Sequence, residues 1–185
     1  MIKIMSILAL VLGANFSQAN VVNALAIQQA LLPSFTTQLI FWEVGQKMEH
    51  KISVMNLEGS MATEVKKETE VGYWLNQDVS IAGQEQKVQM LISKEDGTIL
   101  EMIVNGQKQT PPATPEVEIL EQKEANITVP AGTYDCLFVK VKDVATENIS
   151  EVWINPKLIP INGMLKAILR QQGLEVAAEL VSFKK

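Results

Sequence analysis

The chain of 185 residues has few of the side chains on which catalytic, metal-binding and disulfide-bonded proteins depend. Its single cysteine, Cys136, excludes a disulfide within the chain, so the fold must depend on hydrophobic burial. Its single histidine, His50, excludes a metal site built from two histidines. Arg170 is the only arginine and the net charge is −5, which argues against the basic clusters that bind nucleic acid.

Familiar catalytic motifs are missing as well. The sequence contains no G-x-S-x-G nucleophile turn, no Asp-rich calcium loop and no glycine-rich phosphate loop. His50 lies in an alternating segment without a recognisable nucleophile, and Cys136 lies between Tyr134 and Phe138, where we expect a buried, unreactive thiol. We therefore expect no enzymatic activity, no metal and no cofactor. The alternative to this expectation is a hydrolase or isomerase whose site is built from Glu, Asp, Tyr and His50 in an unrecognised arrangement.

The first nineteen residues are typical of a secretory signal peptide. Lys3 supplies a positive start, residues 4–13 are apolar, and the small residues Ser17 and Ala19 precede Asn20. We expect cleavage between Ala19 and Asn20 and a periplasmic or secreted protein. After residue 32 no apolar run reaches the ~20 residues of a membrane-spanning helix, so we predict no transmembrane span in the mature chain.

The mature chain divides into a short N-terminal segment and one β-rich domain. Residues 20–34 are mostly apolar all round, which predicts either a buried helix capped by Asn20 or an exposed leader. Residues 35–185 form the single domain. Hydrophobic and polar residues alternate in segments 48–54, 61–71 and 87–92, which indicates strands with one buried face. Asp96-Gly97 and Asn105-Gly106 predict hairpins with type I′ turns.

The second half of the domain gives weaker signals. The proline-rich residues 110–115 predict a stiff crossover loop rather than a linker between domains. Strands are expected at about 116–121 and 126–129, followed by a turn at 130–132 and a strand over 134–142 with two apolar faces. Residues 163–183 are compatible with a hairpin or a helix pair, and we favour the hairpin.

The aromatic residues are the candidate binding groups. Trp42, Trp74 and Trp153 lie in strand-like segments, and Phe138 lies on one face of the 134–142 strand. Core packing is their ordinary role. The functional alternative is that Trp42, Trp74, Phe138 and Trp153 line a cavity inside a curved sheet and contact an apolar ligand such as an acyl chain.

Spaced fragments of the sequence resemble a group of exported bacterial proteins of unknown function. Residues 129–136 read V-P-A-G-T-Y-D-C, matching that group's V-P-A-G-T-[FY]-x-C turn. Residues 152–166 resemble its V-W-x-x-x-x-[VI]-P-x-x-G-[ML]-[VL]-K element, with one additional residue between Trp153 and Ile159. The group is similar to the lipoprotein-localisation (LolA/LolB-like) half-barrels. The resemblance implies a mainly β fold, an antiparallel curved sheet or half-barrel around helical or loop cover, with an apolar concave face. With the helix expected near the N-terminus, this gives the predicted fold class.

Together these features predict a non-enzymatic exported protein of the cell envelope. One interpretation gives it an apolar ligand, a lipid or acyl chain, in the concave face of the sheet. The alternative is a structural or protein-interaction module of the envelope that binds another envelope protein and no small ligand.

Overall fold

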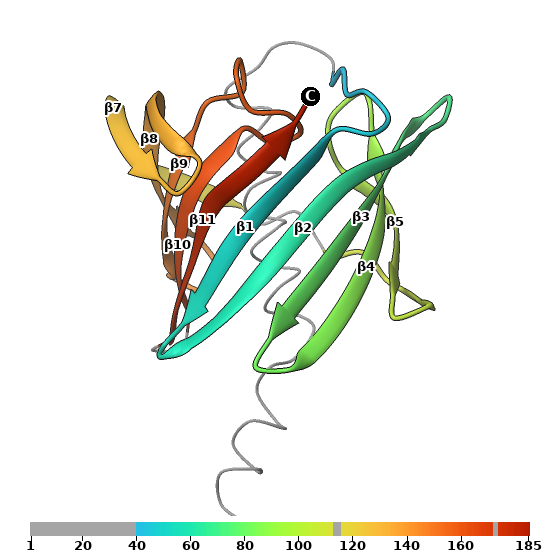
Figure 1. Cartoon of the computed structure of the whole chain (residues 1–185), viewed down its shortest axis with the longest axis horizontal. Helices are drawn as coiled ribbons and strands as arrows, with labels where there is room; N and C mark the ends of the chain where they lie inside the picture. Colours follow the sequence, from blue (N-terminus) through green and yellow to red (C-terminus); the bar gives the residue numbers. More distant parts are fainter. Residues whose placement is uncertain (1–39, 113–115, 172–173) are drawn as a thin grey trace, which may run out of the picture.

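The computed structural model describes residues 40–112, 116–171 and 174–185. Within these ranges eleven strands form one antiparallel sheet in the order β6-β5-β4-β3-β2-β1-β11-β10-β9-β8-β7 (Figure 1). The strands are β1 (Lys47–Val54), β2 (Leu57–Glu68), β3 (Gly72–Ile81), β4 (Gln84–Ser93), β5 (Ile99–Val104), β6 (Gln107–Gln109), β7 (Val117–Val129), β8 (Gly132–Asp143), β9 (Ile149–Ile154), β10 (Met164–Gln171) and β11 (Leu174–Lys184). The predicted mainly β, antiparallel domain is confirmed.

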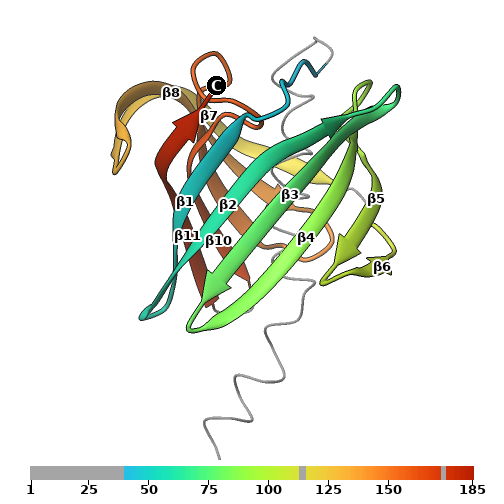
Figure 2. The same cartoon turned by 45° about the vertical axis from the view of Figure 1, so that its right-hand side comes forward.

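The sheet is open, with β6 and β7 as its two edge strands. It is curled because these two strands are consecutive in the chain. The connection from Gln109 to Val117 joins β6 to β7, which lie at opposite ends of the strand order. Eleven strands laid flat span about 47–49 Å at the usual strand spacing. The connection reaches at most about 26–29 Å even when fully extended. The sheet must therefore bend its edges toward each other, as Figure 2 shows.

Period-two alternation directs one face of each strand to the interior. In β1, Met48, His50, Ile52 and Val54 are buried, whereas the residues between them are partly exposed. Side chains from distant strands meet on this face: Met48 of β1, Val88 of β4 and Val129 of β7 belong to one hydrophobic cluster. The concave face is therefore the core of the domain.

Of the two predicted type I′ turns, the one at Asn105-Gly106 is present and the one at Asp96-Gly97 is replaced by a longer loop. Asn105 and Gly106 both have positive φ, at 50° and 81°, as the predicted type I′ turn between β5 and β6 requires. Between β4 and β5 five residues form the connection, and of the predicted pair only Gly97 has positive φ. There the Asp96 carboxylate accepts hydrogen bonds from the Thr98 backbone and hydroxyl, which favours the longer loop.

In the second half of the chain, the structure corrects one predicted strand boundary and decides between the predicted hairpin and the helix pair. The two strands predicted at about 116–121 and 126–129 are one strand, β7 (Val117–Val129), because the polar residues between them are compatible with an exposed edge strand. Leu120 forms a bulge in its pairing with β8. Residues 164–171 and 174–184 pair as the strands β10 and β11 of a hairpin rather than forming a helix pair.

No helix occurs in the described ranges, and none of their residues forms a helix long and apolar enough to cross a membrane. The predicted signal peptide, its cleavage between Ala19 and Asn20, and the predicted helix or leader over 20–34 lie outside the described residues.

Candidate functional site

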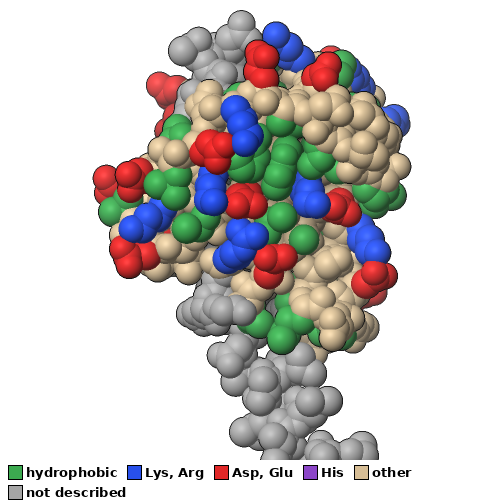
Figure 3. Space-filling view, turned by 90° about the vertical axis from the view of Figure 1, so that its left-hand side faces the viewer, with side chains coloured by type: hydrophobic (Ala, Val, Ile, Leu, Met, Phe, Trp, Pro, Cys, Tyr) green, Lys and Arg blue, Asp and Glu red, His purple; other side chains and the backbone are tan. Residues whose placement is uncertain are grey.

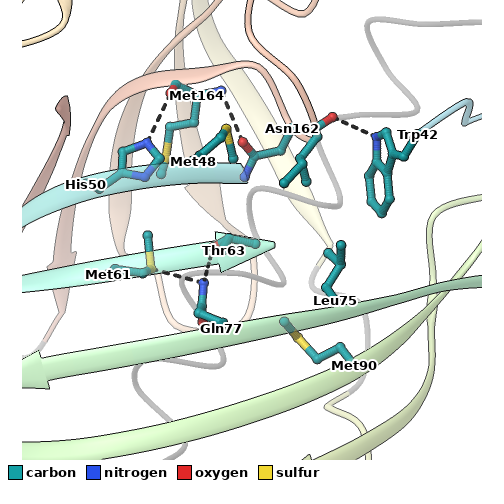
Figure 4. Close-up of a pocket in the computed structure, with 11 residues that line it drawn as sticks. Trp42, Met48, His50, Met61, Thr63, Leu75, Gln77, Met90, Asn162 and Met164 are labelled. Carbon is teal, nitrogen blue, oxygen red and sulfur yellow. Dashed lines mark hydrogen bonds between the residues drawn. The ribbon is translucent and has the colours of Figure 1, made fainter. Parts of the chain in front are cut away.

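A pocket lies inside the curled sheet, beneath the loop that joins β9 to β10 (Figure 4). Its volume, measured as space for the centre of a water-sized sphere, is about 10 Å³. That space accepts roughly one water molecule. The lining is mainly apolar and rich in sulfur: Trp42, Met48, His50, Met61, Thr63, Leu75, Gln77, Met90, Ile161, Asn162 and Met164.

The register of the sheet brings the pocket residues of β1 and β2 together. His50 pairs with Met61, and Met48 pairs with Thr63. Because directly opposite residues in an antiparallel pair point to the same face, all four side chains point inward. Further along the sheet Thr63 pairs with Gln77 of β3. The lining is thus one continuous patch of the concave face.

The loop over residues 155–163 covers this patch and is tightly held. Asn155 accepts hydrogen bonds from the Leu158 and Ile159 backbone, and its own backbone N–H donates to Gly163 O at 2.8 Å. Gly163 has a φ of +70°, and a Cβ there would lie 2.7 Å from Pro156. Glycine is therefore required at this position.

Ile161 in the same loop has an unusual backbone conformation. Its φ is +62°, although it is β-branched and only 8% exposed. Such a conformation is strained for a β-branched residue. The Trp42 indole N–H donates to Ile161 O at 2.9 Å, and Trp42 also contacts Tyr73 with ring centroids 5.6 Å apart. The tryptophan thus fixes the strained residue over the pocket.

His50 is the titratable group of the pocket, and it is neutral at physiological pH. Its side chain is almost fully buried, and this burial lowers its pKa to about 4, although a hydrogen bond to Met164 opposes the shift. Nε2 lies 3.1 Å from the Met164 carbonyl oxygen. Since a carbonyl oxygen only accepts, Nε2 carries the proton and Nδ1 has a free lone pair. Within the part of the chain that the structure describes, Nδ1 has no hydrogen-bond partner.

Gln77 is the second buried polar group. Its Nε2 donates to the Met61 thioether at 3.0 Å and to the Thr63 hydroxyl at 3.2 Å. Its Oε1 is buried without a hydrogen-bond partner. Buried polar atoms are usually hydrogen-bonded, so two unpaired acceptors on one pocket patch require an explanation.

The structure brings only one of the four predicted aromatic residues to this pocket. Trp42 lines it, whereas Trp74, Phe138 and Trp153 do not. Trp74 is flanked in β3 by the buried Tyr73 and Leu75 and is itself partly exposed, because neighbouring residues of a strand point to opposite faces.

Phe138 and Trp153 form a separate pair on β8 and β9. Their ring centroids lie 5.0 Å apart, and lysine ammonium groups lie over both rings: Lys123 over Phe138 and Lys166 over Trp153. Figure 3 shows the side of the molecule that bears β7 to β9 in Figure 1, where hydrophobic side chains lie among basic and acidic ones. The pair is therefore separate from the pocket.

Cys136 is half-buried rather than fully buried. Desolvation raises the pKa of its thiol, and the nearby Asp135 carboxylate adds to that effect. The turn before it is closed by the Tyr134 hydroxyl, which donates to Ala131 O at 2.9 Å. Ala131 and Tyr134 of this segment therefore stabilise the turn.

Among the described residues no group of three or more His, Cys, Asp and Glu side chains is placed to hold a metal ion. The methionines that line the pocket cannot be singled out from sequence alternation alone, because a methionine at alternate positions of a strand looks like any other core residue. The signal that could have identified them is Met48 and His50 at alternate positions of one strand.

No protein-family model matches this sequence, and no curated protein is similar to it. Among solved structures, the chain is similar to a Bacteroides fragilis protein with a YmcC-like fold, at 11% identity and a TM-score of 0.44, covering 81% of this chain and 100% of the other. It is also similar to MucB in a MucA/MucB complex from Pseudomonas aeruginosa, at 9% identity and a TM-score of 0.45. That match covers 89% of this chain and 56% of the other chain, so this chain spans about half of it. At these scores the likeness carries no functional conclusion.

Proposed function

We propose that the protein is a non-enzymatic, exported protein of the cell envelope that binds an extended segment of another envelope protein along the free edge of β7. The observation that carries the proposal is the exposure of this edge. β7 is thirteen residues long, pairs with β8 alone among the described strands, and is exposed without interruption over residues 118–124.

An unpaired strand edge offers backbone N–H and C=O groups to a further strand. Partner segments that add to a sheet edge gain affinity from these groups and specificity from alternate side chains. β7 has the length for such an addition, and the partly exposed apolar side chains of Ile119 and Leu120 lie within it.

The charge of the edge indicates the kind of partner. Residues 116–124 contain Glu116, Glu118, Glu121 and Glu124 against one basic residue, Lys123. Lys123 pairs with Glu121 at 2.7 Å, and Glu118 lies opposite Lys142 of β8, so carboxylates still outnumber lysines along this edge and attract cations. Two copies joined by this edge would place acidic residues against acidic residues, so a segment rich in lysine fits better than a second copy.

The proposal that the protein is not an enzyme rests on the burial of His50. The only histidine is buried in the sheet, where a dissolved substrate does not reach it. The proposal that the protein is exported rests on residues 1–19, which have the form of a signal peptide. We also propose that the protein is related to the exported LolA/LolB-like proteins that its sequence resembles. N-terminal sequencing of the mature protein that returned Asn20 would support export, and Met1 would contradict it.

Binding of two short peptides tests the edge. We expect the mature protein to bind a peptide of alternating Lys and Val, and to bind the Glu and Val counterpart about tenfold or more weakly. The variant E118K/E121K/E124K should reverse this preference. The control variant E43K/E85K/E95K changes the net charge equally at exposed sites away from β7, and it should keep the wild-type preference.

Hydrogen exchange gives the second measurement. Strand addition should slow exchange of the β7 amides and leave those of β3 unchanged. If the basic peptide binds both variants equally, or protects no β7 amide, the edge is not the binding site.

An apolar ligand is the second candidate, favoured by the methionines of the concave face. Met48, Met61, Met90, Met102 and Met164 are all buried, and methionine side chains repack readily around apolar partners. The pocket as it stands accepts about one water molecule, so an acyl chain would need the core to open. Native mass spectrometry of protein purified from its own envelope decides the matter: a co-purifying lipid supports this candidate, and ligand-free protein excludes it.

A further inference from the structure

We propose that the pocket beneath the β9–β10 loop binds a single soft monovalent metal ion, Cu(I), through Nδ1 of His50 and the thioethers of Met48 and Met61, with Met164 adjacent. The proposal goes beyond the edge function proposed above and does not depend on it, because the pocket and the β7 edge share no residue.

His50 has the geometry of a metal ligand. In protein metal sites a ligating histidine generally donates its other ring N–H to a carbonyl or carboxylate, which fixes the ring and the tautomer. Here Nε2 lies 3.1 Å from the Met164 carbonyl oxygen, and Nδ1 is left buried, unprotonated and without a partner among the described residues. A free lone pair is thus fixed at the pocket wall.

The thioethers surround the same space. Met61 lies directly opposite His50 in the β1–β2 register, and Met48 lies two residues before His50 on the same face of β1. The Gln77 amide donates to the Met61 sulfur at 3.0 Å and thereby orients it. Figure 4 shows the Met48, Met61 and Met164 side chains directed into the space beside the imidazole.

The loop residues also indicate a built site rather than loose packing. Ile161 is held in a strained conformation, and the Asn162 side chain accepts from Met164 N at 3.1 Å. This arrangement fixes the start of β10, where Met164 lies against His50. Strained backbone persists where surrounding structure enforces it, which is frequent at ligand sites.

The chemistry of the donors selects the ion. Thioethers are soft ligands that favour Cu(I), whereas Mg²⁺ and Ca²⁺ require oxygen donors and structural zinc sites use thiolates and imidazoles. All the donors here are neutral, so a single positive charge is easier to bury than a double one. The cavity accepts about one water-sized sphere, which suits one ion.

The experiment is an anaerobic titration of the full mature protein with Cu(I) against a coloured Cu(I) chelator. We expect one equivalent of Cu(I) to be retained by the wild type and no Zn²⁺. Met48→Leu and Met61→Leu keep the side-chain volume and remove the sulfur, so each should weaken Cu(I) binding about tenfold or more. His50→Gln should weaken it as well.

Met102→Leu is the matched control, because Met102 is a buried methionine of the same core that does not line the pocket. It should bind Cu(I) as the wild type does. X-ray absorption of the loaded protein should show sulfur and nitrogen ligands. Wild-type protein that retains no Cu(I) would mean that the cavity holds only water, and equal losses in Met102→Leu and Met48→Leu would mean non-specific methionine chemistry; either result overturns the proposal.

Discussion

Mild acid should destabilise this protein mainly through His50. The pKa of His50 falls from an ordinary value of 6.5 to about 4 in the folded protein because the side chain is buried. Above pH 6.5 the histidine is neutral in both states and its burial brings no pH-dependent penalty. As the pH falls from 6.5 toward 4, the unfolded chain binds a proton that the folded chain does not, so stability is lost.

The size of the effect follows from the two pKa values. Between pH 7 and pH 5 the linkage relation gives a loss of about 2 kcal/mol in the free energy of unfolding. With a urea m-value of about 1–3 kcal/mol/M, the unfolding midpoint should fall by roughly 1 M. Carboxylates with lowered pKa values, such as those of Glu49 and Asp96, titrate at lower pH and contribute little in this window.

Urea unfolding at pH 7 and pH 5 tests the reasoning, with a metal chelator present throughout. His50→Gln removes the only histidine, so its midpoint should change far less than that of the wild type over the same interval. Equal changes in both proteins would refute the assignment. So would an imidazole NMR titration of the folded protein with a pKa near 6.5.

Three further outcomes are expected. Gly163→Ala should lower the free energy of unfolding by about 1–3 kcal/mol, measured by urea unfolding, because φ is +70° and the new Cβ meets Pro156. Trp42→Phe should lower it by about 1–3 kcal/mol in the same assay, because Ile161 O loses its buried donor. Cys136 should react with a thiol reagent more slowly in the native protein than in urea, because burial and Asp135 raise its pKa.

The strands themselves were predictable because their signal is local. Met48, His50, Ile52 and Val54 alternate with polar residues in the sequence, and the structure buries those four side chains. Asn105-Gly106 identified a hairpin because few residue pairs accept two positive φ values. The β10–β11 hairpin was harder, because its Ala, Leu and Glu residues also favour helix, and pairing with β1 and β9 decides the outcome.

The pocket was not predictable because it depends on the order of strands. Met164 is 114 residues away from His50 in the chain, and they meet only because β11 and β10 follow β1 in the sheet. Alternation tells which face a residue takes and not which strand lies beside it. The same limit explains the aromatic residues: Trp74 and Trp153 were recognised as strand residues, and the structure assigns neither to the pocket.

Two costs to stability meet in this pocket, and their coincidence supports its functional role. His50 is buried with an unpaired nitrogen, and Ile161 is held at a φ of +62° above it. The other non-glycine residues with positive φ in the described ranges, such as Met55 and Asn105, are exposed and not β-branched. If the pocket served packing alone, leucine at position 50 and glycine or asparagine at position 161 would be more stable. An unpaired buried nitrogen and a strained β-branched residue thus lie at the same pocket, and their coincidence is the structural support for the metal site proposed there.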